Sequence, residues 1–113
     1  MRGRSGGSGR DDGIGAVFSA LADPTRRALV DRLADRPATA TELALVVPVS
    51  RQAVVKHLQA LDAAGLVERT RDGRSVRFRL HPDPLDDAVD WMNRAGSRWE
   101  HRLRHLRDQV RPE

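Results

Sequence analysis

The chain of 113 residues is long enough for one domain with a modest hydrophobic core. The absence of cysteine excludes disulfides, thiolate metal sites and cysteine nucleophiles, and no apolar run reaches the ~18 residues of a membrane span, so we expect a cytoplasmic protein with no membrane partner. The net charge of +4 is concentrated in residues 51–80, where seven basic side chains face three acidic ones, and this suggests a polyanionic partner.

The N-terminal segment differs in composition from the rest of the chain. Residues 1–12 consist of glycine, serine and charged residues with little to bury, and we expect a disordered tail there. Residues 13–110 are expected to form the folded domain. A second helix is predicted from the capping pair Asp23-Pro24 to the residues before Pro37. The preceding first helix has an apolar face at helical spacing, formed by Ile14, Val17, Phe18 and Leu21.

Residues 39–67 have the pattern of a short helix, a tight turn and a longer helix. Thr39 and Glu42 match a capping box at the start of the short helix. Pro48 lacks an N–H and disfavours the helical conformation at Val47, so we expect the short helix to end there.

The longer helix, residues 51–64, is expected to begin after the N-cap Ser50 and to end at Gly65. Two helices joined by so short a turn are typical of a helix-turn-helix, whose second helix enters the major groove of DNA. Its buried stripe is expected to be Val54, Leu58 and Leu61. Subtracting that stripe leaves the candidate DNA-contacting residues Ser50, Arg51, Gln52, Val55, Lys56 and Gln59.

Beyond Gly65 the hydrophobic pattern alternates, which predicts strands. Asp72-Gly73 predicts a two-residue turn, so residues 67–80 are expected to form a hairpin, the wing of a winged helix. Two arginines that flank the turn, Arg71 and Arg74, are candidates for contacts to phosphates or a narrow minor groove. Arg77 and Arg79 either join them or form only the solvated face of the strand.

A long last helix is predicted up to about Val110. Its apolar positions alternate spacings of four and three, as in a coiled-coil seam, and its ~39 Å exceeds what a domain of this size needs for its own packing. We therefore expect a homodimer, although the helix could instead fold back on the first helix of a monomer. The expected dimer interface comprises Leu85, Val89, Met92, Trp99, Leu103 and Leu106, with Gly96 in the one gap.

Three segments resemble the ArsR-type winged helix-turn-helix repressors: residues 18–33, 54–61 and 65–67, with sequences FSALADPTRRALVDRL, VVKHLQAL and GLV. The resemblance extends over roughly residues 14–110. It implies a mainly α fold with a small β-hairpin wing. It also implies a dimeric transcription factor whose first and last helices form the interface. The expected function is a sequence-specific regulator, a repressor, that binds a palindromic double-stranded DNA operator through the helix 51–64 and the wing 67–80.

Metal sensing is the alternative within that family. Ala44 and Val46 occupy the positions of the family's Cys-x-Cys pair, so the thiolate site is absent. His101 and His105 lie one helical turn apart and could share a zinc ion, but the last helix lacks the family's usual ligand pattern. The stretch from Trp91 to Glu100 is more similar to the subgroup without metal sites, so we expect no metal or cofactor and leave open an unknown small-molecule effector. The acidic and histidine candidates are Asp86, Asp87, Asp90, His101 and His105.

Two other classes of function are disfavoured by the sequence. The only cluster of acids lies at the start of the last helix, where acidic residues favour the helix dipole, and no nucleophile–base pair accompanies it, so no enzyme is expected. A winged helix used only to bind protein would favour a neutral or acidic second helix, whereas Arg51 and Lys56 make this one basic.

Overall fold

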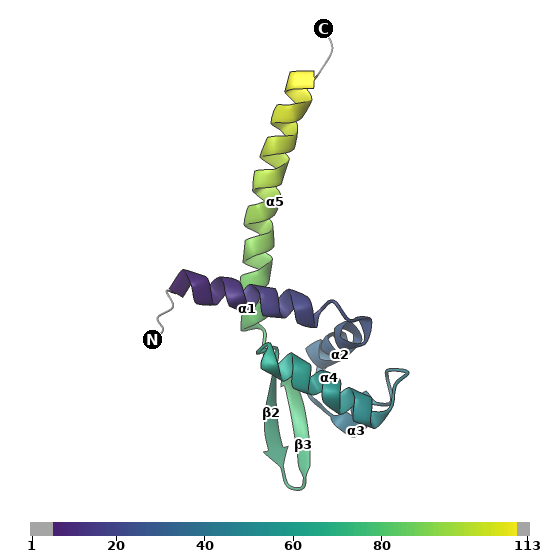
Figure 1. The fold of residues 1–113 in the computed structure, drawn as a ribbon. Coiled ribbons are helices and arrows are strands. Elements are labelled where there is room, and N and C mark those ends of the chain that lie inside the picture. Colours follow the sequence, from purple (N-terminus) through teal and green to yellow (C-terminus); the bar gives the residue numbers. More distant parts are fainter. Residues whose placement is uncertain (1–5, 111–113) are drawn as a thin grey trace.

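The computed structural model describes residues 6–110, with side chains from residue 13 onward. The elements follow the order α1-α2-β1-α3-α4-β2-β3-α5. The first four helices and a small sheet form a winged domain, and α5 projects away from it on the side opposite the β2–β3 hairpin (Figure 1). The described chain is therefore elongated, with extents of 70 × 40 × 20 Å. Within residues 6–110 none of the helices combines the length and apolarity that crossing a membrane requires.

The first helix, α1 (Gly6–Ala20), begins earlier than expected. The helix thus includes residues 6–12, where the sequence analysis expected a disordered tail, while residues 1–5 lie outside the described residues. The buried side chains of Ile14, Val17 and Ala20 anchor the helix on the core. Once such a helix is nucleated, each further residue gains one backbone hydrogen bond, so it can extend into a polar segment.

The second helix, α2 (Pro24–Asp35), is capped as the sequence predicts. Asp23 Oδ1 accepts hydrogen bonds from the backbone N–H groups of Thr25 at 2.8 Å and Arg26 at 3.1 Å. The bond from Arg26 is the main cause that holds the pKa of Asp23 below its ordinary value. Leu29 and Leu33 are buried, so this helix forms one wall of the core that supports the rest of the domain.

A three-stranded antiparallel sheet with the order β1-β3-β2 replaces the simple hairpin that the sequence predicts. β2 (Val67–Asp72) and β3 (Ser75–Leu80) form the expected wing. The additional strand β1 (Ala38–Thr39) is not predicted, because two residues are too few to show an alternating pattern. It pairs with β3 and so attaches the base of the wing to the start of α3.

The turn of the wing lies one residue later than expected. Asp72 pairs with Ser75 as the last pair of the ladder, so the two turn residues are Gly73 and Arg74. Gly73 has φ +64°, the conformation that a glycine at the first turn position of a hairpin supplies. Arg74 therefore stands at the tip of the wing itself.

The core collects apolar side chains from α1, α2, α3, α4 and the base of the sheet. The predicted stripe of the longer helix is confirmed, since Val54, Leu58 and Leu61 are at most 1% exposed. This burial fixes which face of that helix points outward. The largest fully buried side chains are Leu29, Leu43, Leu58, Leu61, Leu66, Val17 and Val54.

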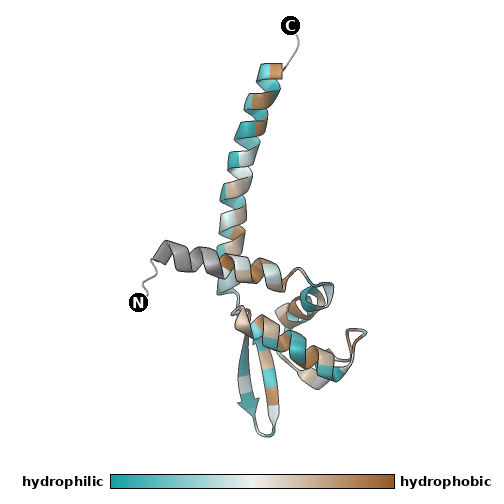
Figure 2. Cartoon of the chain, viewed as in Figure 1, coloured by the Kyte–Doolittle hydropathy of each residue, from teal (hydrophilic) through white to brown (hydrophobic). Residues whose placement is uncertain are grey.

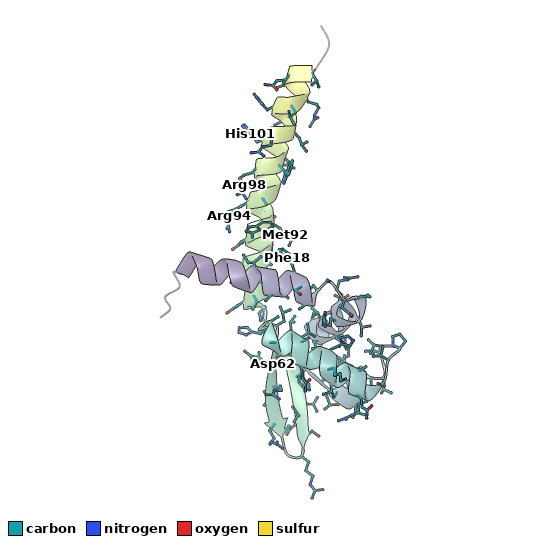
Figure 3. All side chains as sticks on the ribbon, viewed as in Figure 1. Phe18, Asp62, Met92, Arg94, Arg98 and His101 are labelled. Carbon is teal, nitrogen blue, oxygen red and sulfur yellow. The ribbon has the colours of Figure 1, made fainter. Side chains whose placement is uncertain are left out.

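The last helix, α5 (Asp83–Val110), contacts α1 only near its own beginning. Ala88 is buried there, and the Trp91 ring meets the Phe18 ring edge-to-face at 5.9 Å between centroids. Figure 3 shows Phe18 at this crossing and Arg94 and Arg98 farther along the projecting part. The fold-back alternative thus describes only the first part of α5.

Apolar residues recur along the projecting part of α5, where no other element covers them (Figure 2). These residues belong to the predicted seam. In the single chain the exposed fraction of these residues runs from 46% for Met92 to 59% for Trp99, and it reaches 75% for Val110 at the end of the helix. Leu85 is the exception, since it packs against the core. The exposed members are Val89, Met92, Trp99, Leu103, Leu106 and Val110.

Candidate nucleic-acid interface

The short helix α3 (Ala40–Leu43) begins with the predicted capping box. The Glu42 backbone N–H donates to Thr39 Oγ1 at 3.1 Å, and the Thr39 N–H donates to Glu42 Oε1 at 2.9 Å. The second of these bonds is the main cause that lowers the pKa of Glu42. The helix ends at Leu43, not near Val47 as expected, because the N–H groups of Leu45 and Val46 bond three residues back and tighten the chain into turns.

The longer helix α4 (Arg51–Ala63) has the predicted boundaries to within one residue. Ser50 Oγ accepts a hydrogen bond from the Ala53 N–H at 3.1 Å and caps the helix. Gly65 has φ +78°, the left-handed conformation that ends helices, and the Leu66 N–H returns to Leu61 O at 2.9 Å. Both ends of α4 are therefore fixed by local chemistry that the sequence encodes.

The outward face of α4 carries the candidate DNA-contacting side chains. Val55 is half-buried, so only part of its side chain reaches the surface. Within the described part of the chain, the side chains of Gln52, Lys56 and Gln59 make no hydrogen bond or ion pair. Their donors and acceptors are thus available to an external ligand. The exposed residues at the start and on this face are Ser50, Arg51, Gln52, Lys56 and Gln59.

The four arginines that the sequence placed on the wing fall into two pairs. Arg77 lies 3.6 Å from Glu42 and 3.9 Å from Asp72, and Arg79 donates to Glu68. Arg71 and Arg74 are exposed, and no acidic partner is found for either among the side chains of residues 13–110. Acidic neighbours thus compensate the charges of Arg77 and Arg79, whereas those of Arg71 and Arg74 stay open to an anion.

A groove of about 480 Å³ separates the start of α4 from the wing. Arg51, Arg69 and Arg74 line it, together with Thr41, and its lining contains no acidic residue. Sequence reasoning did not single out Arg69. The available signal was its spacing of two from Arg71, which places both arginines on the same face of β2. Asp62, labelled in Figure 3, lies 3.8 Å from Arg69 and compensates part of its charge.

Known proteins share this architecture and parts of this sequence. A family described as a helix-turn-helix domain matches residues 21–70. The transcriptional repressor SdpR of Bacillus subtilis (strain 168) is 33% identical over 76 residues, which are 67% of this chain and 84% of SdpR. The solved structure of an ArsR-like transcriptional regulator from Rhodococcus sp. RHA1 superposes with a TM-score of 0.79 and 36% identity, covering 93% of this chain and 99% of that one.

The chain belongs to the ArsR family of winged helix-turn-helix transcriptional regulators. The resemblance and the mainly α fold with a small β wing are thereby confirmed, and so is the expected class of function, a DNA-binding regulator of transcription. A further ArsR-like structure is the homodimeric winged helix-turn-helix DNA-binding domain Mb0332 of Mycobacterium bovis. It has a TM-score of 0.65 and 27% identity, and covers 89% of this chain and 95% of that one.

The metal-ligand candidates of this ArsR-family chain lie apart from the groove between α4 and the wing. Among residues 13–110, whose side chains the structure describes, no three histidine or acidic side chains come together in an arrangement that could hold a metal ion. His101 and His105 are both exposed on α5, and His105 Nε2 lies 3.1 Å from Gln109 Nε2. His101 lies on the projecting part of the helix (Figure 3), far from the wing.

Proposed function

We propose that this ArsR-family regulator is a repressor that binds a palindromic operator as a homodimer. In this proposal α4 enters the major groove, and the β2–β3 wing contacts the adjoining backbone. The observation that carries the proposal is the outward face of α4. The side chains of Gln52, Lys56 and Gln59 on that face have no partner among the residues whose side chains are described, and the arginine-lined groove lies beside them.

The roles on α4 follow from the donors and acceptors of each side chain. Gln52 can donate to and accept from adenine, and Arg51 or Lys56 can donate to guanine. Val55 can meet a thymine methyl group with the part of its side chain that remains exposed. Gln59 lies one helical turn beyond Val55. It would contact DNA only where the major groove curves back toward α4.

Phosphate contacts are proposed at both ends of this surface. The Ser50 oxygen is occupied as a helix cap, but its O–H and the first N–H groups of α4 can still donate to a phosphate. Arg71 and Arg74 are placed for phosphates or a narrow minor groove, because no acidic residue in the described chain competes for them.

The homodimer is proposed through the seam of α5. The seam is about half exposed along the projecting part of the helix, which the winged domain does not cover. A two-fold interface would bury it against the same surface of a second copy and would hold two recognition helices about one DNA turn, ~34 Å, apart. The homodimeric state of the related Mb0332 domain supports the proposed dimer. The similarity to the repressor SdpR supports repression. The proposed function needs no cofactor, places the protein in the cytoplasm and leaves room for a small-molecule effector.

Selection of bound fragments from the host genome, followed by affinity measurements, tests this function. Gln52→Ala should cost ~1–3 kcal/mol on the selected operator and relax the preference at one base position. Arg74→Ala should weaken binding to all sequences similarly and reduce the salt slope by about one. Arg79→Ala is the matched control, since Glu68 already compensates that arginine, and it should change the slope less. Unchanged operator and random-DNA affinities for Gln52→Ala would refute the assignment of α4.

A further inference from the structure

One hydrogen bond joins the two helices of the helix-turn-helix at their exposed side. Arg51 Nε, at the first residue of α4, donates to Thr41 Oγ1 of α3 at 3.0 Å. Both residues are exposed and both line the groove between α4 and the wing. Arg51 therefore differs from Lys56 and Gln52, whose side chains make no such hydrogen bond with any side chain described in residues 13–110.

The atom used in this bond determines what Arg51 can still do. A guanidinium is a planar fork of five N–H donors, and Nε lies on its side edge. With Nε bound to Thr41, the edge formed by the two terminal nitrogens remains to donate two parallel hydrogen bonds. The O6 and N7 atoms of guanine accept two such bonds in the major groove. Fixing the plane in advance also removes part of the rotamer freedom that a long side chain loses on binding.

The chemistry of the acceptor is equally informative. Arg77 and Arg79 are oriented by carboxylates, which compensate their charge as they orient them. The Thr41 hydroxyl is neutral, so it orients Arg51 and leaves the positive charge intact. No acidic residue lines the groove that Arg51 shares with Arg69 and Arg74. Arg51 is thus oriented by a neutral acceptor, and no acidic side chain in the groove compensates its charge. This suits a contact with an electronegative base edge.

We propose that Thr41 is a positioning residue for base recognition, which holds Arg51 so that its terminal nitrogens read a guanine in each half-site. This inference rests on the proposed function and adds a specificity determinant outside the recognition helix. Thr41 itself need not contact the DNA, because its effect passes through Arg51.

The test compares three variants against a set of operators that carry every single-base change. Thr41→Val keeps the shape of the side chain but removes the acceptor, and Thr41→Ser keeps the hydroxyl. Thr41→Val should reduce the preference for guanine about three- to tenfold, at the position that Arg51→Ala also relaxes. Thr41→Ser should retain that preference to within about twofold, and thermal unfolding of each variant reports any loss of fold.

The double variant separates positioning from other roles. In the Arg51→Ala background, Thr41→Val should have no further effect on base preference, because the residue it positions is gone. An effect of Thr41→Val that persists there, or that weakens all sequences equally, would overturn the inference while leaving the proposed function intact. If Arg51→Ala changes the preference at no position, both the inference and the proposed base contact of Arg51 fail.

Discussion

Replacing Leu103 by glutamate should dissociate the proposed dimer without unfolding the winged domain. Complete burial of a leucine contributes ~1.5–3 kcal/mol. Leu103 is 47% exposed in the single chain, so a partner can bury about half of this side chain. The two symmetric copies of Leu103 together therefore contribute ~1.5–3 kcal/mol per dimer. The loss of this burial should raise the dimer dissociation constant of Leu103→Glu by about 10- to 150-fold. The glutamate charge adds a desolvation cost to this loss.

Sedimentation equilibrium at a range of concentrations measures this change directly. Ser97→Glu is the matched control, because Ser97 is exposed on α5 but lies outside the seam, and it should leave the dimer intact. The thermal midpoint of Leu103→Glu at low concentration, where wild type is also dissociated, should match wild type because α5 projects away from the core. A wild type that sediments as a monomer at tens of micromolar, or a Leu103→Glu variant that stays dimeric, would refute the reasoning.

Two further predictions concern acid and metals. The pKa values of Asp23 and Glu42 are both lowered from their ordinary values of 3.8 and 4.5. Their capping bonds therefore contribute fully to stability at a pH above these ordinary values, which apply to the unfolded chain. The contribution is lost as the pH falls through the lower pKa values of the folded state. Glu42→Gln, followed by thermal unfolding from pH 6 to pH 3, should therefore lose less stability than wild type, and an equal loss would contradict the capping account. Micromolar zinc, cobalt or nickel should leave operator affinity within about twofold, as expected for a chain without the family's metal-site patterns; a tenfold zinc effect that His101→Ala abolishes would show the opposite.

The sequence predicts those features that depend on nearby residues. The caps at Asp23, Ser50 and Gly65 are local arrangements between residues a few positions apart, and all are confirmed. The buried stripe of α4 follows from helical periodicity, and its confirmation also determines which side chains face outward. The candidate DNA face therefore follows from periodicity alone, by subtracting the buried stripe from the helix.

The remaining features depend on contacts between distant segments. The strand β1 forms because β3 is available to pair with Ala38 and Thr39, and no local sequence pattern predicts it. The turn shifts to Gly73-Arg74 because pairing along the whole ladder, up to Asp72 with Ser75, sets the register.

Ion pairing shows the same dependence. The amino-acid composition alone does not distinguish the arginines of the wing. In the structure, Arg77 and Arg79 have acidic neighbours on α3 and on the paired strand, whereas Arg74 has none among the described side chains. The bond from Arg51 to Thr41 likewise joins residues from two helices. Periodicity carries no signal for such contacts.

Footprinting of the protein on its selected operator tests the central claim most directly. A dimer that places two α4 helices in the major groove should protect two symmetric half-sites with centres about one helical turn, ~10 bp, or a multiple of it apart. The protection of both half-sites should weaken together for Leu103→Glu, and the base preference within each should relax for Gln52→Ala. A single unsymmetric protected patch, or a pattern that neither substitution alters, would contradict the account.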